Sequence, residues 1–253
     1  MGRSKKPTRS TIEIAPRKHI GSGGAGTGEL VYGRRAVAEA KRGRRRVRRV
    51  WTTPEVSASE LARLAGSPDH QGVVAEVDPY PYADPDSLLD RPDALVVALD
   101  QVQDPRNLGA LLRTADAFGV HGVIVPKHHA VGLTEAAART AMGAVEHIPV
   151  ARETNLVSAL EKLKESGVWI YGAAAERGIA PWAADLTGPL CLVLGSEGEG
   201  LRPLVVRACD VMVTVPMQGG VGSLNVAAAG AALCYEVARQ REARSTPSDP
   251  KTA

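Results

Sequence analysis

The sequence predicts an α/β fold, in which a mostly parallel sheet is covered by helices and is preceded by a small, basic α+β unit. Two observations carry this prediction. From residue 94 onward, near-continuous apolar runs alternate with helix-like segments, as is typical of parallel strands buried on both faces. Before residue 92 the segments are shorter and rich in arginine. The segment "RPD" at 91–93 marks the boundary, so we expect two units, 29–92 and 93–242.

The two ends of the chain are predicted to be disordered tails, 1–28 and 243–253. The first is polar, basic and rich in glycine, with no sustained apolar period. Gly21, Gly23 and Gly26 match the spacing GxGxxG, but no strand precedes them. A dinucleotide site needs that strand, so the match indicates a linker and disfavours a nicotinamide-dependent enzyme.

The unit 29–92 contains two predicted helices and two predicted strands. A helix over 34–42 ends at Gly43, "RRVRRVWTT" alternates like a strand, "ASELARLAG" is a short helix, and "QGVVAEVD" is a second strand.

Positive charge is concentrated at the start of the chain. The first 50 residues carry 15 Lys and Arg against 3 Asp and Glu, whereas the rest carries 16 against 25. This asymmetry favours a nucleic-acid partner, and a solvated, solubilising segment is the alternative. The candidate contacts in this part of the chain are Arg34, Arg35, Arg45 and Arg46.

The unit 93–242 alternates strands and helices. The predicted strands are "ALVVALD", "GVIVP", "VWIYGAAA", "PLCLVLG" and "VMVTVPM", and the predicted helices are 108–118, 134–143, 155–166, 200–208 and 223–241. Ligands of parallel sheets lie beyond the carboxyl ends of the strands. The loops that follow Asp100, Leu194 and Val215 are therefore the places to look for a site.

The first of these loops leads into the helix of "DPRNLGALLRTADAFG". Asn107 lies near its start and Gly119 closes it. Gly109 and Arg113 are four residues apart and share a face. A ligand could lie over Gly109 and present an anionic group to Arg113; the alternative is a surface arginine paired with a nearby acid.

The second and third loops are rich in glycine. In "LVLGSEGEGL" the glycines let backbone groups approach a ligand. Glu197 and Glu199 would repel a phosphate, so this loop suits a ligand with hydroxyls, an amine or a positive charge. In "VPMQGGVGSLNVAAAGAAL", Ser223 falls at a helix N-cap position, and Asn225 lies in the first turn, where a poor helix former needs a partner.

Composition excludes several other classes of protein. Cys191, Cys209 and Cys234 are far apart in apolar surroundings, so we expect buried, reduced thiols and no metal. No apolar run approaches the roughly 18 residues that a membrane span needs, and the start lacks a secretion signal. We therefore expect a cytoplasmic location.

The three loop motifs, in this order, resemble those of the SpoU/TrmH branch of the SPOUT RNA 2′-O-methyltransferases, over about 95–238. In addition, "VYGRRAVAEA" followed by "HQGVVAEV" resembles the ribosomal-protein-L30-like RNA-binding domain of the family's ribosomal RNA members. Only about 17 residues separate the two predicted strands of this unit, fewer than such domains usually have, which indicates an abridged form.

The resemblance implies a C-terminal trefoil knot that binds S-adenosylmethionine, an active site at a homodimer interface, and no metal. Arg113 matches the family's catalytic arginine, with Asn107, Glu197, Ser223 and Asn225 as the other catalytic positions; Arg113 would also contact RNA. The positions that match the cofactor site are Leu194, Gly195, Val215, Met217 and Leu224.

The implied activity is 2′-O-methylation of a ribose in RNA, foremost a guanosine in 23S rRNA. The alternatives are a tRNA or antibiotic-resistance rRNA 2′-O-methyltransferase of the same family, and a non-catalytic RNA-binding or ribosome-assembly protein.

Overall fold

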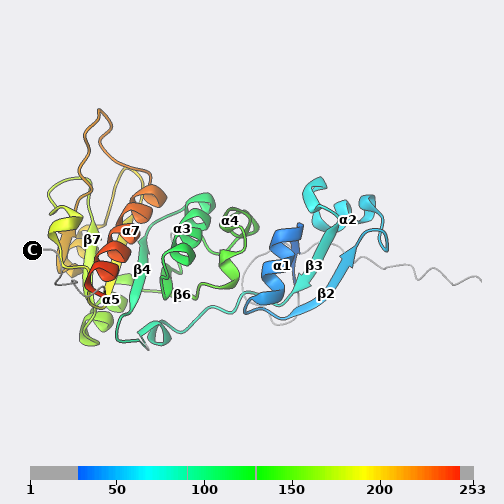
Figure 1. Cartoon of the computed structure of the whole chain (residues 1–253), viewed down its shortest axis with the longest axis horizontal. Helices are drawn as coiled ribbons and strands as arrows, with labels where there is room; N and C mark the ends of the chain where they lie inside the picture. The colour runs from blue at the N-terminus through cyan, green and yellow to red at the C-terminus, as the bar shows by residue number, and fades with distance from the viewer. Residues whose placement is uncertain (1–27, 90, 129, 246–253) are drawn as a thin grey trace, which may run out of the picture.

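The computed structural model describes residues 28–89, 91–128 and 130–245, and it contains two sheets (Figure 1). The first sheet, with its two helices, forms a part that we call the N-terminal unit. Its strands lie in the antiparallel order β1-β3-β2. The elements are β1 (Glu29–Tyr32), α1 (Arg34–Arg42), β2 (Val47–Thr52), α2 (Ala58–Ala65) and β3 (Val73–Val77), with a short 3-10 turn at Pro68–His70. The sequence predicted all of these except β1 and the 3-10 turn.

The second sheet has six strands in the order β6-β5-β4-β8-β7-β9, and every pair in it is parallel. This confirms the predicted α/β fold. The strands are β4 (Leu95–Asp100), β5 (Gly122–Pro126), β6 (Val150–Glu153), β7 (Trp169–Ala173), β8 (Leu190–Gly195) and β9 (Val211–Val213). Strand β6 was not predicted, and β9 is shorter than its apolar run.

Five α-helices cover the two faces of this sheet. They are α3 (Pro105–Ala117), α4 (Glu135–Ala141), α5 (Leu156–Glu165), α6 (Pro203–Ala208) and α7 (Val226–Ser245), with short 3-10 turns at Pro85–Leu89, Ala144–Glu146 and Pro181–Ala183. Along β4, Leu95, Val97 and Leu99 face the core under α3, α4 and α7, whereas Val96 and Ala98 face the core under α5 and α6. Both faces are buried, which explains the continuous apolar runs.

The predicted tails lie mostly outside the described residues, as do the glycines at 21, 23 and 26. Helix α7 continues to Ser245, three residues into the predicted C-terminal tail. The cysteines are free thiols, as predicted; Cys191 and Cys234 are buried and Cys209 is half-buried. Burial raises the pKa of Cys209 to about 11 and that of Cys234 to about 12, so both thiols are protonated and unreactive at neutral pH.

The N-terminal unit is joined to the second sheet by a buried ion pair. Arg45 Nε donates to Glu146 Oε2 at 2.9 Å, its Nη2 pairs with Glu146 Oε1, and its Nη1 donates to Glu29 Oε2 at 2.6 Å. The side chains of Arg45 and Glu146 are 3% and 2% exposed. Burial lowers the pKa of the guanidinium, but the hydrogen bonds and charges of the two carboxylates outweigh this and raise it. Arg45 is therefore a structural cation.

The segment between the two sheets is also held at one buried residue. The Tyr80 hydroxyl donates to the Ile148 carbonyl at 2.6 Å and accepts from the Val150 amide at 3.2 Å. Burial raises the pKa of Tyr80 to about 12, so the phenol keeps the proton that it donates. The linker is thereby fixed at the start of β6.

Replacing Arg45 by Met should lower the free energy of unfolding by roughly 3–5 kcal/mol, because the Glu146 carboxylate would remain buried without a cation. The double variant Arg45→Met, Glu146→Leu should recover much of this loss. Urea denaturation followed by circular dichroism measures both. Arg46→Met, at the exposed neighbouring position, is the matched control and should change stability by less than about 0.5 kcal/mol. An Arg45→Met midpoint equal to that of the native chain would contradict the structural role.

Candidate active site

Three segments meet at the carboxyl edge of the large sheet. Helix α3 follows β4, the loop 196–202 follows β8, and the loop 214–225 follows β9 and leads into α7. The last loop stands out from the body of the molecule (Figure 1, orange). Because all six strands are parallel, these segments share one edge, as the sequence predicted.

Asn107, Glu197 and Asn225, which we call the amide–carboxylate cluster, come together at this edge. Asn107 Nδ2 donates to Glu197 Oε1 at 2.8 Å, and Asn225 Nδ2 donates to Asn107 Oδ1 at 3.0 Å and also to Glu197 Oε1. The three residues come from three different segments, and Asn107 and Asn225 are 118 positions apart. The fold thus assembles three of the five predicted catalytic residues.

Asn225 also begins helix α7. Its Oδ1 accepts from the backbone amides of Ala227 at 2.9 Å and Ala228 at 3.4 Å, and the helix starts at Val226. The prediction that Ser223 is the N-cap is therefore wrong. Ser223 lies two residues earlier and is exposed. The partner that Asn225 needs is partly its own helix and partly the cluster.

The loop after β8 owes its glycines to its own turn. Ser196 and Gly200 exchange backbone hydrogen bonds of 3.1 and 3.0 Å. Gly198 and Gly200 have φ angles of 90° and 70°. A Cβ on Gly195 would lie 2.2 Å from the backbone carbon of Gly200. We expected these glycines to bring backbone groups close to a ligand; in the structure they let the loop fold back on itself and present Glu197.

Asp100 is a site residue that the sequence analysis missed. Its carboxylate is fully buried at the end of β4 and accepts from Arg202 N at 2.9 Å and Arg202 Nε at 2.7 Å. This ion pair fixes the far end of the 196–202 loop to the sheet. The signal was present, because Asp100 is the charged residue that ends an otherwise apolar strand.

Arg113 lies on a different face of α3 from Asn107. Its Nη1 contacts the Met142 sulfur at 3.0 Å, at the end of α4. The proposed open patch over Gly109 is wrong, because Gly109 is buried and a Cβ there would lie 2.4 Å from the Ala137 carbonyl oxygen. Glycine at this position permits the close packing of α3 on α4. The guanidinium of Arg113 is exposed beside that contact.

The predicted cofactor residues lie on two of the three segments. Leu194 is buried at the end of β8 and Gly195 follows it; Val215 and Met217 are half-buried on the loop before α7, and Leu224 is exposed. Among the described residues, no backbone hydrogen bond joins 215–224 to another segment.

The glycines of that loop, Gly219, Gly220 and Gly222, are not held by contacts within the described part of this chain. A Cβ on any of them would meet nothing within 4 Å, and none has a positive φ. Packing within this chain therefore does not require glycine at these positions.

The candidate RNA-binding arginines of the N-terminal unit do not form one surface. Arg34, Arg35 and Arg46 are exposed, and Arg34 Nε donates to the Gln71 carbonyl at 3.3 Å. Arg45 was wrongly predicted to contact RNA, because it is buried with Glu146 and Glu29. Alternation along the chain does not reveal which arginine meets an acid from a distant segment, here Glu146 of the 3-10 turn after α4.

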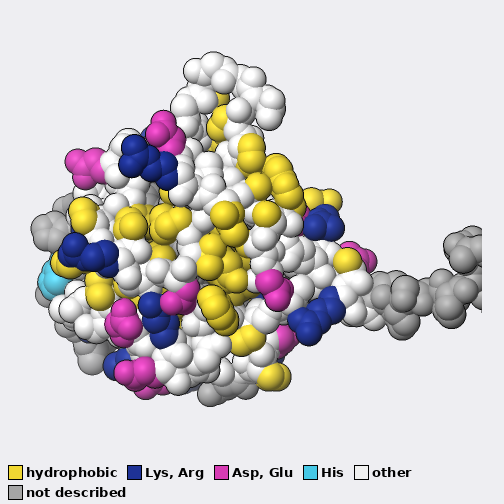
Figure 2. Space-filling view, turned by 90° about the vertical axis from the view of Figure 1, so that its left-hand side faces the viewer, with side chains coloured by type: hydrophobic (Ala, Val, Ile, Leu, Met, Phe, Trp, Pro, Cys, Tyr) yellow, Lys and Arg dark blue, Asp and Glu magenta, His cyan; other side chains and the backbone are white. Residues whose placement is uncertain are grey.

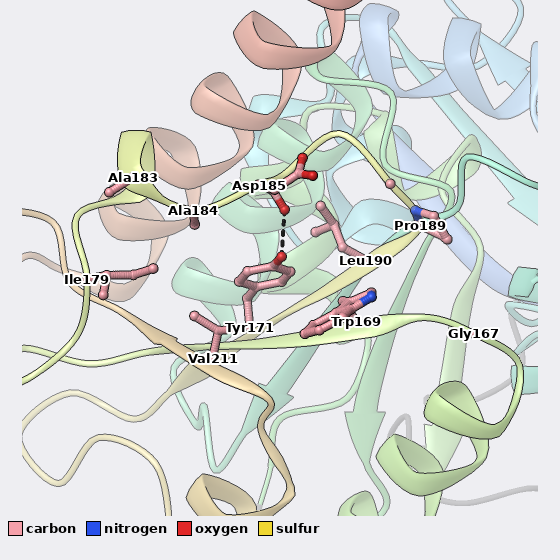
Figure 3. A pocket seen from close by; sticks show the side chains of 11 residues that line it. Gly167, Trp169, Tyr171, Ile179, Ala183, Ala184, Asp185, Pro189, Leu190 and Val211 are labelled. Carbon is pink, nitrogen blue, oxygen red and sulfur yellow. Dashed lines mark hydrogen bonds between the residues drawn. The ribbon is translucent and has the colours of Figure 1, made fainter.

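A hollow of about 430 Å³ lies at the amino edge of the large sheet, opposite the amide–carboxylate cluster (Figure 3). Trp169, Leu190 and Val211, which line it, are the first residues of β7, β8 and β9. The Tyr171 hydroxyl donates to the Asp185 carbonyl there. Hydrophobic side chains gather on this end of the molecule (Figure 2). The hollow is thus apolar and separate from the amide–carboxylate cluster.

No helix within the described ranges is long and apolar enough to cross a membrane. In the same ranges, no group of three His, Cys, Asp or Glu side chains is placed to hold a metal ion. Fold and site together define a parallel α/β protein with an amide–carboxylate site at its carboxyl edge, joined to a small basic unit.

Comparison with known families agrees with this class. Residues 94–235 match the SpoU rRNA Methylase family, and residues 52–83 match the RNA 2′-O ribose methyltransferase substrate binding family. The chain belongs to the SpoU rRNA methylase family, as the three loop motifs indicated.

Individual relatives cover most of the chain. An uncharacterized tRNA/rRNA methyltransferase of Synechocystis is 39% identical over 84% of this chain, which spans 63% of that relative's length. The 23S rRNA (guanosine-2′-O-)-methyltransferase RlmB of Pseudomonas syringae is 47% identical over 70% of this chain and 73% of its own. The crystal structure of the SpoU methyltransferase AviRb from Streptomyces viridochromogenes, in complex with AdoMet, superposes with a TM-score of 0.72 at 31% identity, over 85% of this chain and 90% of that one.

Replacing Asn225 by Ala should lower the free energy of unfolding by about 1 kcal/mol, because α7 loses its N-cap. Ser223→Ala, two residues away, should change it by less than about 0.5 kcal/mol. Urea denaturation of both variants tests this assignment. A larger loss for Ser223→Ala than for Asn225→Ala would restore Ser223 as the cap.

Proposed function

We propose that the protein transfers a methyl group from S-adenosylmethionine to a ribose 2′-oxygen in RNA, foremost a guanosine in 23S rRNA. The observation that carries this proposal is the meeting of Asn107, Glu197 and Asn225 beside the loop 214–225. The identity with RlmB supports the choice of 23S rRNA, and the AdoMet complex of AviRb supports the cofactor. We place this activity in the cytoplasm, where its RNA substrates are made.

The residues at the carboxyl edge fit S-adenosylmethionine. Val215, Met217 and Leu224 offer apolar contacts for an adenine ring, and we propose that the backbone of Leu194 and Gly195 at the end of β8 completes the site. The backbone groups of 215–224, which no other described segment engages, can donate to and accept from its edge. Glu197 lies at this edge and carries a negative charge, which suits a sulfonium. When bound, this cofactor supplies an electrophilic methyl group.

The protein's own residues must align a weak nucleophile and stabilise the charge that develops on it. In the proposal, Asn107, Glu197, Ser223 and Asn225 bind and orient the ribose hydroxyl. The amide nitrogens of Asn107 and Asn225 already hold the Glu197 carboxylate in place. The exposed hydroxyl of Ser223 is free to turn toward an incoming ribose.

Arg113 is assigned to the RNA backbone. A guanidinium keeps its proton at neutral pH and makes a poor general base, but it binds phosphate with two parallel hydrogen bonds. Its exposed position on α3 allows it to hold the phosphate next to the reacting ribose and so to steer the 2′-hydroxyl.

The N-terminal unit is proposed to bind the substrate RNA. The match of 52–83 to a substrate-binding family supports this role. Arg34, Arg35 and Arg46 would contact phosphates, so binding should weaken as salt rises. Three statements about the two units stay predictions. They are the boundaries 29–92 and 93–242, an abridged L30-like form of the first unit, and a trefoil knot in the second.

The methyl-transfer proposal is tested with labelled S-adenosylmethionine on unmodified 23S rRNA, with total tRNA in parallel. We expect label in one rRNA guanosine, and Arg113→Ala should lower the rate roughly 10²–10³-fold while calorimetric cofactor binding is unchanged. The rate of Arg113→Lys should lie between those of the native protein and Arg113→Ala, because lysine keeps the positive charge but cannot make two parallel hydrogen bonds.

Arg207→Ala, at an exposed position on α6, is the matched control for that assay and should keep the native rate. Label in tRNA alone would favour the tRNA alternative. Absence of label with intact cofactor binding would favour an RNA-binding or assembly role.

We also propose a homodimer that forms through the loop before α7 and the exposed side of that helix. Val221 and Tyr235 are 63% and 59% exposed there, and Leu224 is 37% exposed. Apolar side chains exposed in one region are typical of a subunit interface. Tyr235 packs edge-on against Phe118 at the end of α3, so a partner on this face would lie close to the helix that carries Arg113.

Light scattering after gel filtration should give a mass about twice the 26.6 kDa of one chain. Tyr235→Glu should shift it to the mass of one chain, because a charge would be buried at the interface. Trp169→Glu, at the opposite edge of the sheet, should leave the mass unchanged. A native mass equal to that of one chain would remove the dimer from the proposal.

A further inference from the structure

A cavity of about 290 Å³ lies between the N-terminal unit and helix α4. Its inner wall includes the buried pair Arg45 and Glu146, so the contact between the two sheets itself creates it. Its outer wall comes from β1, α1 and the segment 133–143. The side chains that matter below are Tyr32, Glu135, Ala138, Arg139 and Met142.

The cavity adjoins the proposed catalytic arginine. Met142 forms part of its wall, and the Met142 sulfur is the atom that Arg113 Nη1 contacts at 3.0 Å. A phosphate held by Arg113 therefore lies one side chain away from the cavity. A base attached to that part of the RNA backbone is the nearest group that could enter it.

Met142 has an unusual backbone that presents its side chain to this space. Its φ is 50°, in the left-handed region that non-glycine residues rarely adopt. The side chain is a large apolar group and 41% exposed. This residue is the C-cap of α4, where a left-handed backbone commonly ends a helix. A flexible thioether packs well on the face or edge of an aromatic ring.

The charges of the cavity suit a base and not a phosphate. Arg45 pairs with both carboxylates of the inner wall, Glu29 and Glu146, and this one cation leaves the wall with a net negative charge. On the outer wall, Glu135 Oε1 accepts from the Tyr32 hydroxyl at 3.0 Å and from Arg139 Nη2 at 3.1 Å. Among the described residues, Glu135 Oε2 accepts no hydrogen bond, and the side chain is 48% exposed. A free carboxylate oxygen repels phosphate and accepts N–H groups.

We propose that this cavity binds a guanine base of the substrate RNA, unstacked next to the ribose that Arg113 positions. Guanine carries two adjacent N–H donors, on N1 and N2, and a carboxylate can accept both. Glu135 Oε2 accepts from N2, and Oε1 accepts from N1 as the Tyr32 hydroxyl turns away. Met142 and Tyr32 flank the ring. This inference rests on the proposed function, because it takes RNA as the substrate.

The test compares labelled pentaribonucleotides UUGUU, UUAUU and UUIUU, where I is inosine, by fluorescence anisotropy at low salt. Inosine lacks the N2 amino group of guanosine. The native protein should bind the guanosine pentamer about tenfold more tightly than the adenosine pentamer, with inosine between them. Phosphate contacts elsewhere are the same for all three, so the preference reports on the base.

Two variants locate this preference. Glu135→Gln places an amide donor where the carboxylate was and should reduce the preference to below about threefold. Ala138→Trp fills the cavity and should remove the preference while the circular dichroism spectrum stays native. The matched control is Glu161→Gln, at an exposed position on α5 across the sheet, and it should keep the full preference. Equal binding of guanosine and adenosine by the native protein, or an undiminished preference in Glu135→Gln, would overturn the inference.

The binding assay and the methyl-transfer assay can contradict the two proposals separately. Methyl transfer to RNA without a guanosine preference removes the cavity proposal and leaves the proposed function. A guanosine preference without methyl transfer to either RNA removes the proposed function and leaves a guanine-binding cavity in an RNA-binding protein.

Discussion

The close packing of α3 on α4 is the contact on which the rest of the site depends. Because Gly109 has no side chain, the two helices approach until the Ala137 carbonyl oxygen lies 2.4 Å from where a Cβ would be. This approach places the end of α4 against Arg113. The 3-10 turn just beyond α4 carries Glu146, which receives Arg45 of the N-terminal unit. The absence of a side chain at Gly109 thus helps to set the position of the N-terminal unit relative to Arg113.

The buried ion pair accounts for part of the uneven charge along the chain. The basic segment carries more arginines than one strand can expose without repulsion, and the structure removes one of them into a pair with Glu146 and Glu29. Such a pair adds little net stability compared with an apolar contact. Its geometric demands are strict, however, because a misaligned unit would leave Glu146 buried and unpaired. The pair is therefore better understood as fixing orientation than as strengthening the fold.

The large sheet was predictable from the sequence because both of its faces are buried. Its longer strands therefore consist of consecutive apolar residues. Strands β1 and β6 were missed because "ELVY" and "VARE" are four residues long, contain charge, and lie at the edges of their sheets. Short edge strands carry little periodicity.

The site was predictable only in part. The motifs identified Asn107, Glu197 and Asn225, and the shared strand edge predicted that they meet. Three features of the site depend on contacts between distant segments. They are the packing of Gly109 on a helix and not a ligand, the burial of Arg45 and not Arg46, and the capping of α7 by Asn225 and not Ser223. Local spacing holds no information about such contacts.

Helix α3 separates the two proposed functions along its length. Arg113 lies six residues after Asn107, which is about 9 Å along the axis and on another face. Asn107 turns to the loops that fit a cofactor, and Arg113 turns to α4 and the N-terminal unit. A small ligand and an RNA would therefore approach the helix from two sides, and the reacting ribose must reach across it. The exposed apolar side chains near α7 offer one way to close that gap, because a second copy on this face would lie beside the end of the same helix.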